Sequence, residues 1–275
     1  MKPHFLFPAS PLDSLMIDEA FQDQAIALKM AGFECSVLTD DMKIIGPLSK
    51  IDGDPDVRVI YRGWMMDTEN YQGYLEKLAA RPVVPLTSMP EYLAAHHLPN
   101  WYSRIERHTP KSAVFPNTPE TPEDVCNFCA GAFAGVEGVK LQIKDYVKSL
   151  KTGSGSVVTS ADEVREVLAN MQKYRGTIEG GIVVRWWEDF FPGSEVRYFV
   201  INGRYYGEQS AFDIRAMRIL EDVKGLIPSP FWSIDIAMRV EDGEFRVVEI
   251  GDGQVSDLVG WTEQRFAQVW QQATL

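Results

Sequence analysis

Two acidic residues and an arginine lie in predicted strands of the second half of the chain, where they could bind a metal ion and a phosphate group. Asp235 lies in the apolar run WSIDIAMRV, Glu249 ends the apolar run of EFRVVEI, and Arg197 lies in EVRYFVI. Carboxylate oxygens suit a hard cation such as Mg²⁺, and a planar guanidinium can grip a pair of phosphoryl oxygens. These residues therefore predict a site for Mg²⁺ and phosphate.

Paired strands would bring these side chains together. WSIDIAMRV and EFRVVEI are separated by the turn sequence EDG, which favours a hairpin. In that hairpin Asp235 comes close to Glu249. Because side chains alternate between the two faces of a strand, Glu195 shares a face with Arg197.

A purely structural interpretation is also open. Glu195 and Arg197 could form a surface ion pair, which contributes little stability, and the acids at 235 and 249 could be solvated hairpin residues. However, Asp235 lies between two isoleucines and Glu249 follows an apolar run. Charged groups near a core usually have a paired or metal-bound partner, which favours the metal site.

A lysine-rich segment precedes a flexible loop in the middle of the chain. Side-chain alternation places Lys140, Gln142 and Lys144 on one face of a predicted strand, and the loop GSGS follows at 153–156. Glycines let backbone N–H groups approach an anion closely, so the segment could cradle phosphate. It is not a P-loop, because the Gly-Lys-Ser/Thr sequence at a helix start is missing.

The first 88 residues alternate between predicted strands and helices, which indicates a small α/β lobe with a parallel sheet. The first strand–helix junction lacks the glycine-rich dinucleotide signature, so this lobe is expected to bind substrate or to pack against the rest. Arg62 ends a predicted strand, where such sheets place ligand contacts. A solvated arginine is the alternative.

Composition narrows the possible functions. The chain has 275 residues, of which 45% are hydrophobic and 24% charged, with a formal net charge of −12. Nucleic-acid binding is not expected, because phosphate backbones are held by clustered Lys and Arg. No run approaches the roughly 18 apolar residues of a membrane span and no signal peptide is evident, so we expect a cytoplasmic protein without a membrane partner.

Cysteine and histidine patterns indicate neither a disulfide framework nor a nucleophile. The three cysteines cannot all pair, and the motif Cys126-x-x-Cys129 has no second half to complete a zinc site. Both are expected to be small apolar residues of a helix. The four histidines form no catalytic motif.

The order of lysine strand, Gly/Ser loop, helix, Glu-x-Arg strand, Ile-Asp strand and Glu-terminated strand resembles the ATP-grasp superfamily. The segments IKDYVKS, EVRYFVINGRYYG, SIDIA and VVEIGDGQVSDL carry the resemblance, which spans about 85–260. It is similar to a bacterial and phage clade in which arginine replaces a phosphate-contacting lysine. The implied α/β architecture is a lobe at 1–88 followed by an ATP-grasp domain at 89–275, whose α+β subdomains at 89–184 and 185–275 clasp ATP.

The resemblance implies roles in chemistry and metal binding for five residues. Lys144 corresponds to the strand lysine that contacts the α- and β-phosphates. Arg197 corresponds to the arginine that steadies the γ-phosphate or an acyl-phosphate. Asp235 and Glu249 correspond to ligands of Mg²⁺, with Mn²⁺ as an alternative, and Asp252 is a further candidate ligand.

It also implies a nucleotide site. Lysines contact the phosphates, the glycine-rich loop covers them, and the linker Arg-Trp-Trp-Glu reads adenine through its backbone and holds the ribose through its acid. The residues assigned to the nucleotide are Lys144, Lys148, Gly153, Ser154, Gly155, Arg104, Arg185, Trp186, Trp187, Glu188, Glu195 and Arg239.

The sequence departs from the family pattern in two places. The last metal strand usually ends Glu-x-Asn, but here Glu249 is followed by Ile-Gly-Asp, so that Asp252 or Gln254 would have to replace the amide. The early phosphate lysine is also missing, and Arg104, Arg107 and Lys111 remain alternatives for its role.

These features predict an ATP- and Mg²⁺-dependent ligase. It would join a small-molecule or peptide carboxylate to an amine or thiol through an acyl-phosphate, and phosphoryl transfer of this kind needs no protein nucleophile. Two alternatives are a catalytically silent nucleotide-binding protein, favoured by the altered Glu-x-Asn, and a small-molecule kinase. The sequence does not indicate the oligomeric state.

Overall fold

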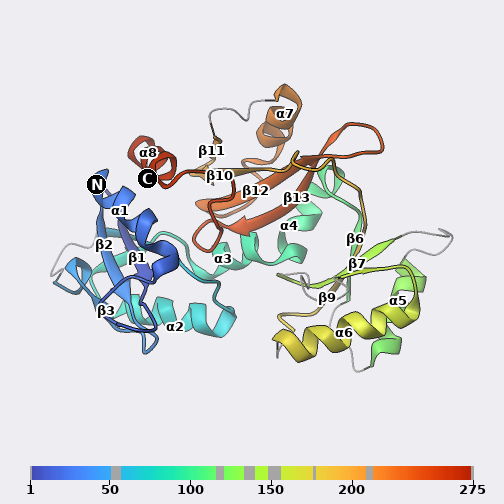
Figure 1. Cartoon of the computed structure of the whole chain (residues 1–275), viewed down its shortest axis with the longest axis horizontal. Coiled ribbons are helices and arrows are strands. Elements are labelled where there is room, and N and C mark those ends of the chain that lie inside the picture. The colour runs from blue at the N-terminus through green and yellow to red at the C-terminus, as the bar shows by residue number, and fades with distance from the viewer. Residues whose placement is uncertain are drawn as a thin grey trace. The chain divides into compact units, whose positions relative to one another are not determined.

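A computed structural model describes residues 2–50, 57–115, 121–132, 140–147, 156–175, 178–208 and 213–273 (Figure 1). The chain divides into two compact units. Unit 1 comprises Met1–Ala95, Val196–Asp235 and Glu249–Leu275, and unit 2 comprises His96–Glu195 and Ile236–Val248. Both units are therefore assembled from segments that are separate in the sequence.

Unit 1 contains a five-stranded sheet of order β3-β2-β1-β4-β5. β1 pairs in parallel with β2 and β4, β4 pairs in parallel with β5, and only the short β3 is antiparallel. This confirms the parallel sheet predicted for the first 88 residues. The strands are β1 (His4–Pro8), β2 (Glu34–Leu38), β3 (Ile44–Ile45), β4 (Val57–Tyr61) and β5 (Val83–Pro85).

Helices cover both faces of this sheet. One core cluster joins Phe5 and Phe7 of β1 to helix α1 (Gln22–Met30) and to the C-terminal helix α8 (Glu263–Gln272). The other joins Leu6 of β1 to helix α2 (Thr68–Ala79). Because neighbouring β1 residues point to opposite faces, the sheet lies between these helices. Figure 1 shows α8 returning beside α1.

A four-stranded sheet of order β11-β10-β12-β13 carries the predicted acids and arginine. Its strands are β10 (Val196–Ile201), β11 (Arg204–Tyr206), β12 (Phe231–Met238) and β13 (Phe245–Asp252), and helix α7 spans Ile214–Val223. The turn between β10 and β11 has positive φ at Asn202 (46°) and Gly203 (72°), as the Asn-Gly pair predicts. The predicted hairpin of β12 and β13 is also confirmed.

Unit 2 contains an antiparallel sheet of order β6-β9-β7-β8. Its strands are β6 (Ser112–Phe115), β7 (Leu141–Asp145), β8 (Val157–Val158) and β9 (Ile182–Trp186). Helices α5 (Pro122–Ala132) and α6 (Ala161–Arg175) pack on one face, against Ile143, Ile182 and Val184. Cys129 of α5 belongs to this core, as the apolar interpretation of the Cys-x-x-Cys pair predicts.

Local sequence signals explain where two of the helices begin. Ser160 and Glu163 form a capping box at the start of α6, because they exchange side-chain to backbone hydrogen bonds of 3.2 and 3.3 Å. Residues 89–105 form two helices, and the break between them lies at His97 and not at Pro99. Pro99 instead lies in the first turn of α4 (Leu98–Ile105), where the missing N–H has no partner to lose, and α3 (Met89–His96) precedes the break.

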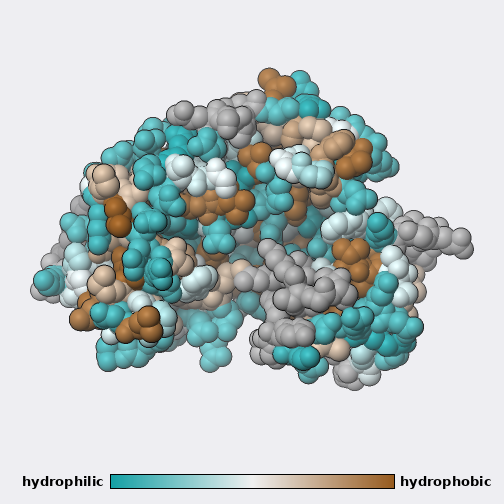
Figure 2. Space-filling view, viewed as in Figure 1, coloured by the Kyte–Doolittle hydropathy of each residue, from teal (hydrophilic) through white to brown (hydrophobic). Residues whose placement is uncertain are grey.

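No helix in the described ranges is long and apolar enough to cross a bilayer. Figure 2 shows hydrophilic residues over most of the viewed face, with hydrophobic groups scattered between them. Leu12 and Met30 of unit 1 are the most exposed of the large apolar side chains among the described residues.

We predict that His4 makes the protein less stable in mild acid. His4 is buried on β1, where its Nε2 lies 2.9 Å from Ser36 Oγ, and burial lowers its pKa from 6.5 to about 4. Between these two pKa values the His4 ring binds a proton in the unfolded chain, whereas it stays neutral in the folded protein. The free energy of unfolding should fall by up to about 3 kcal/mol as the pH falls from 6.5 towards 4.

The measurement is urea unfolding of the parent protein and of His4→Gln between pH 4.5 and 7.5, where the glutamine amide can replace the ring as a partner of Ser36. Subtracting the two curves removes the contribution of the carboxylates. A difference that does not change with pH would contradict the prediction.

Candidate functional site

Arg197 and Asp235 form a buried ion pair within unit 1. Arg197 lies on β10 and Asp235 on the neighbouring β12. Nε of Arg197 donates to Oδ1 at 2.7 Å and Nη2 donates to Oδ2 at 2.6 Å, while the two side chains are 14% and 5% exposed. This two-pronged geometry is the strong form of an arginine–carboxylate pair, and it fixes both groups in orientation.

Glu249 contributes to the electrostatics of the same guanidinium. Burial lowers the pKa of Arg197, but the hydrogen bond and charge of Asp235 together with the charges of Glu249 and Asp257 outweigh it, so that the net shift is upward. Glu249 lies on β13, beside the strand that carries Asp235. The structure thus places both predicted metal ligands on adjacent strands around one arginine.

Asp252 lies in a different environment from Glu249. The two residues are three positions apart on β13 and therefore point to opposite faces. Asp252 is fully buried, and its Oδ1 accepts hydrogen bonds from the backbone N–H and the side-chain amide of Gln254 at 3.0 and 3.1 Å. Burial raises its pKa to about 7, against hydrogen bonds from Gln254 and the charge of Arg62. Its Oδ2 has no hydrogen-bond partner among the described residues.

Gln254 connects this segment to the N-terminal sheet. Its Nε2 donates to Tyr71 Oη at 2.8 Å, and its Oε1 accepts from the backbone N–H of Tyr61 at 3.2 Å. Gln254 O also accepts from Gly63 N at 3.2 Å. The residues after β13 are therefore built into the carboxyl edge of β4. A role as metal ligands for Asp252 and Gln254 stays a prediction.

The described residues contain no group of three His, Cys, Asp or Glu side chains close enough to bind one metal ion. This does not argue against a magnesium site at Asp235 and Glu249, because Mg²⁺ is commonly held by one or two carboxylates and by the substrate phosphates.

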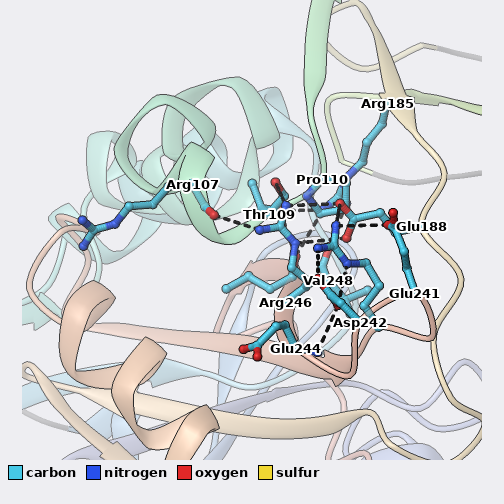
Figure 3. A network of polar contacts seen from close by, with 12 residues as sticks. Arg107, Thr109, Pro110, Arg185, Glu188, Glu241, Asp242, Glu244, Arg246 and Val248 are labelled. Atoms are coloured by element: carbon cyan, nitrogen blue, oxygen red, sulfur yellow. Dashed lines mark hydrogen bonds and ion pairs between the residues drawn. The ribbon is translucent and has the colours of Figure 1, made fainter. Parts of the chain in front are cut away.

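In unit 2, the predicted linker residue Arg185 is anchored by its guanidinium. Nη1 donates to Val248 O at 2.7 Å, and Nη2 donates to Thr109 Oγ1 at 2.6 Å and to Val247 O at 3.3 Å (Figure 3). The side chain is 5% exposed. Arg185 therefore ties β9 to the first half of β13, a packing role that the sequence did not reveal.

Glu188 accepts hydrogen bonds from two arginines. Arg246 donates from Nε at 3.0 Å and from Nη2 at 3.2 Å, and Arg239 donates from Nη1 at 3.3 Å (Figure 3). Arg246 also donates to Arg107 O at 2.8 Å and to Thr109 O at 2.6 Å. The sequence analysis missed Arg246. An arginine inside the apolar strand FRVVEI needs an acidic partner, which is the signal that could have found it.

The other linker residues are less constrained. Lys111 Nζ lies 5.0 Å from the ring centroid of Trp186, a cation–π contact. Trp187 is 39% exposed, and its Nε1 donates to Asp189 at 2.8 Å. Of the three candidates for the early phosphate contact, Lys111 thus lies beside the linker. Arg104 contacts the backbone of its own helix, and the Arg107 guanidinium points away from the Glu188 network.

Lys144 lies on the sheet face opposite the unit 2 helices. On β7 it pairs in register with Val183, and Gln142 pairs with Arg185, so these four side chains share a face. Lys144 is 5% exposed. Lys148, Gly153, Ser154 and Gly155 lie outside the described residues, and Glu195 immediately precedes β10.

Comparison with known proteins identifies the fold. The family model described as ATP-grasp domain, R2K clade family 3, matches residues 105–272. No curated protein matches the chain. D-cycloserine synthetase DcsG is similar in structure, with a TM-score of 0.65 and 13% identity over 98% of this chain and 99% of that one.

Two further solved structures share the fold over nearly the full length. D-alanyl-alanine synthetase A from Vibrio cholerae has a TM-score of 0.56 and 9% identity over 98% of both chains. ATP-grasp ligase PsnB, complexed with a phosphomimetic precursor variant, Mg and ADP, has a TM-score of 0.54 and 14% identity over 99% of this chain and 97% of that one.

An ATP-grasp fold implies ATP binding, and the α+β architecture predicted from the sequence is confirmed. Since the family model covers more than half of the residues, the chain belongs to the ATP-grasp domain family, R2K clade family 3.

Proposed function

We propose that this protein is an ATP- and Mg²⁺-dependent ligase that joins a carboxylate to an amine or thiol through an acyl-phosphate. The observation that carries the proposal is the buried Arg197–Asp235 pair with Glu249 beside it, in a chain of the ATP-grasp family. The structural neighbours that are named synthetases and a ligase support this class of reaction.

The donor set fits a hard divalent cation. Both oxygens of Asp235 accept from Arg197, but a carboxylate has about four lone-pair sites, so each oxygen can still bind a metal. The adjacent guanidinium favours the ionised form of Asp235, which is the form that a metal requires. Asp235 and Glu249 would hold Mg²⁺, or Mn²⁺ in its place. When bound, the ion neutralises phosphate charge.

The protein's own groups position and neutralise the reactants. Arg197 would bind the γ-phosphoryl group, and Lys144 would bind the α- and β-phosphates with Lys148 and the 153–156 loop. The backbone of the linker would contact adenine, and Glu188 would accept a ribose hydroxyl. A carboxylate oxygen of the substrate then attacks the γ-phosphorus as the bond to ADP breaks. The amine or thiol attacks the acyl carbon, and phosphate leaves.

A catalytically silent nucleotide-binding protein is the second candidate. The observation that favours it is the burial of Asp252 and Gln254, the two residues that could replace the missing asparagine ligand, against the N-terminal sheet. A kinase would use the same phosphate contacts with a hydroxyl acceptor.

We predict that ADP release requires a carboxylate and an amine or thiol together. A coupled assay for ADP should be run on a panel of amino acids, short peptides and small acids, each alone and in pairs. Hydroxylamine serves as a generic amine that converts an acyl-phosphate to a hydroxamate. ADP release with one substrate alone would show a kinase, and ATP binding without ADP release from any pair would show a silent protein.

We predict that Asp235→Asn and Glu249→Gln each weaken Mg²⁺-dependent ATP binding at least tenfold, or about 1.4 kcal/mol, because a metal ligand loses its charge. The affinity for Mg·ATP is measured by calorimetric titration. Binding of Mn²⁺ in place of Mg²⁺ is measured by electron paramagnetic resonance. Asp213→Asn is the matched control, since it also removes an aspartate from an arginine pair, at 2.9 Å on the surface of unit 1. Parent-like affinity in both site variants would refute the metal assignment.

A further inference from the structure

Arg62 is a buried arginine at the end of a central strand of the parallel sheet. It follows β4 directly and is 1% exposed. Its backbone N–H donates to Leu6 O at 2.9 Å, which keeps it in register with β1. In open α/β sheets, ligand contacts concentrate at this carboxyl edge of the strands. This position alone does not identify a ligand site, since a packing role would also explain a buried arginine.

Neutral groups hold the Arg62 guanidinium in place. Nε donates to Gln24 Oε1 at 2.7 Å, and Nη1 donates to Gly253 O. The guanidinium carbon lies 4.8 Å from the ring centroid of Phe266. The side chain is therefore fixed by helix α1, by the segment after β13 and by helix α8, all within unit 1.

Among the described residues, the charge of Arg62 has no ion-pair partner within 4.0 Å. Nε and Nη1 donate to neutral oxygens, Nη2 donates to no acceptor in this part of the chain, and the side chain is 1% exposed. Burial lowers the Arg62 pKa to about 10, and the more distant charges of Asp257 and Asp252 only partly oppose this. A buried cation without a counter-charge is costly, so most proteins pair it.

We propose that Arg62 binds a carboxylate of the substrate through Nη2. Asp252 and Asp257 lie close enough to act on Arg62, and they repel a doubly charged phosphate more than a singly charged carboxylate. A carboxylate held by a buried guanidinium is a weaker nucleophile than a free one, so this carboxylate is recognised and not phosphorylated. One of the two substrates then carries a carboxylate besides its reacting group. This assignment to a substrate rests on the proposed ligase function.

Gln24→Glu tests the site without removing Arg62. The substitution has almost the same shape and places a carboxylate where Gln24 Oε1 now accepts from Nε. It supplies the missing counter-charge inside the protein, so the folded state should be at least as stable as the parent, and an external carboxylate should lose its binding site. Gln264→Glu adds the same charge at an exposed position of α8 in unit 1 and is the matched control.

Binding can be measured without catalysis by NMR of the arginine Nε–H groups in ¹⁵N-labelled full-length protein. Sodium acetate is titrated at constant ionic strength, and the Arg62 signal is identified by its loss in Arg62→Lys. We expect a saturable shift of this signal in the parent and in Gln264→Glu, weakened at least tenfold in Gln24→Glu. A shift that does not saturate, an equal shift in Gln24→Glu, or tighter binding of inorganic phosphate would each overturn the proposal.

A kinetic measurement separates this proposal from the ligase function. With a substrate pair that supports ADP release, Gln24→Glu should raise the KM for the substrate with the extra carboxylate at least tenfold and leave the KM for ATP within twofold. The carboxamide analogue should show the same loss with the parent. If Gln24→Glu leaves the KM for the substrate with the extra carboxylate unchanged, the Arg62 site is overturned and the proposed ligase function still stands. Acetate binding without ADP release from any pair would support the anion site and count against the ligase.

Discussion

The two-pronged pair between Arg197 and Asp235 is the interaction on which the rest of the candidate site depends. It joins neighbouring strands at a depth where the side chains are 14% and 5% exposed, so that leaving either charge alone would cost about 3–5 kcal/mol. The Arg197 carbonyl is held in turn by Trp261 Nε1 at 2.9 Å, and Nη1 donates to Asp257 O at 2.9 Å. The pair thus sets the orientation of a guanidinium and a carboxylate together, and Glu249 adds negative charge beside them.

The residues that follow Glu249 in unit 1 connect the Arg197–Asp235 pair to the N-terminal sheet. β13 carries Glu249 and then continues into a segment whose Gln254 side chain contacts Tyr61 and Tyr71. Helix α8 packs against the same unit, since its Phe266 lies in the core and contacts the Arg62 guanidinium. A small lobe that looks separate in the sequence is therefore one compact body with the end of the chain. Substrate contacts proposed for the lobe and metal contacts proposed for β12 and β13 belong to one unit.

In unit 2 the arginine side chains have different hydrogen-bond partners. Arg185 and Arg246 donate mainly to backbone carbonyl groups and to Glu188, and few of their N–H groups remain for a ligand. Lys144 lies on the sheet face opposite α5 and α6, where it is 5% exposed. The arginines therefore stabilise the fold of unit 2, a role that residue type alone did not reveal.

Local sequence patterns determined the strands, their turns and the side chains that they carry. The alternation around Asp235 and Arg197, the Asn202-Gly203 turn and the short hairpin to Glu249 all involve neighbours in the chain, so periodicity and turn chemistry were enough to place them. Tertiary structure alone decided which distant partners meet. Gln254 contacts Tyr71 across 183 positions, Arg62 contacts Gly253 across 191, and Arg246 reaches Thr109 across 137. A period of two residues assigns a side chain to a face of a strand, but it carries no information about the segment that packs against that face.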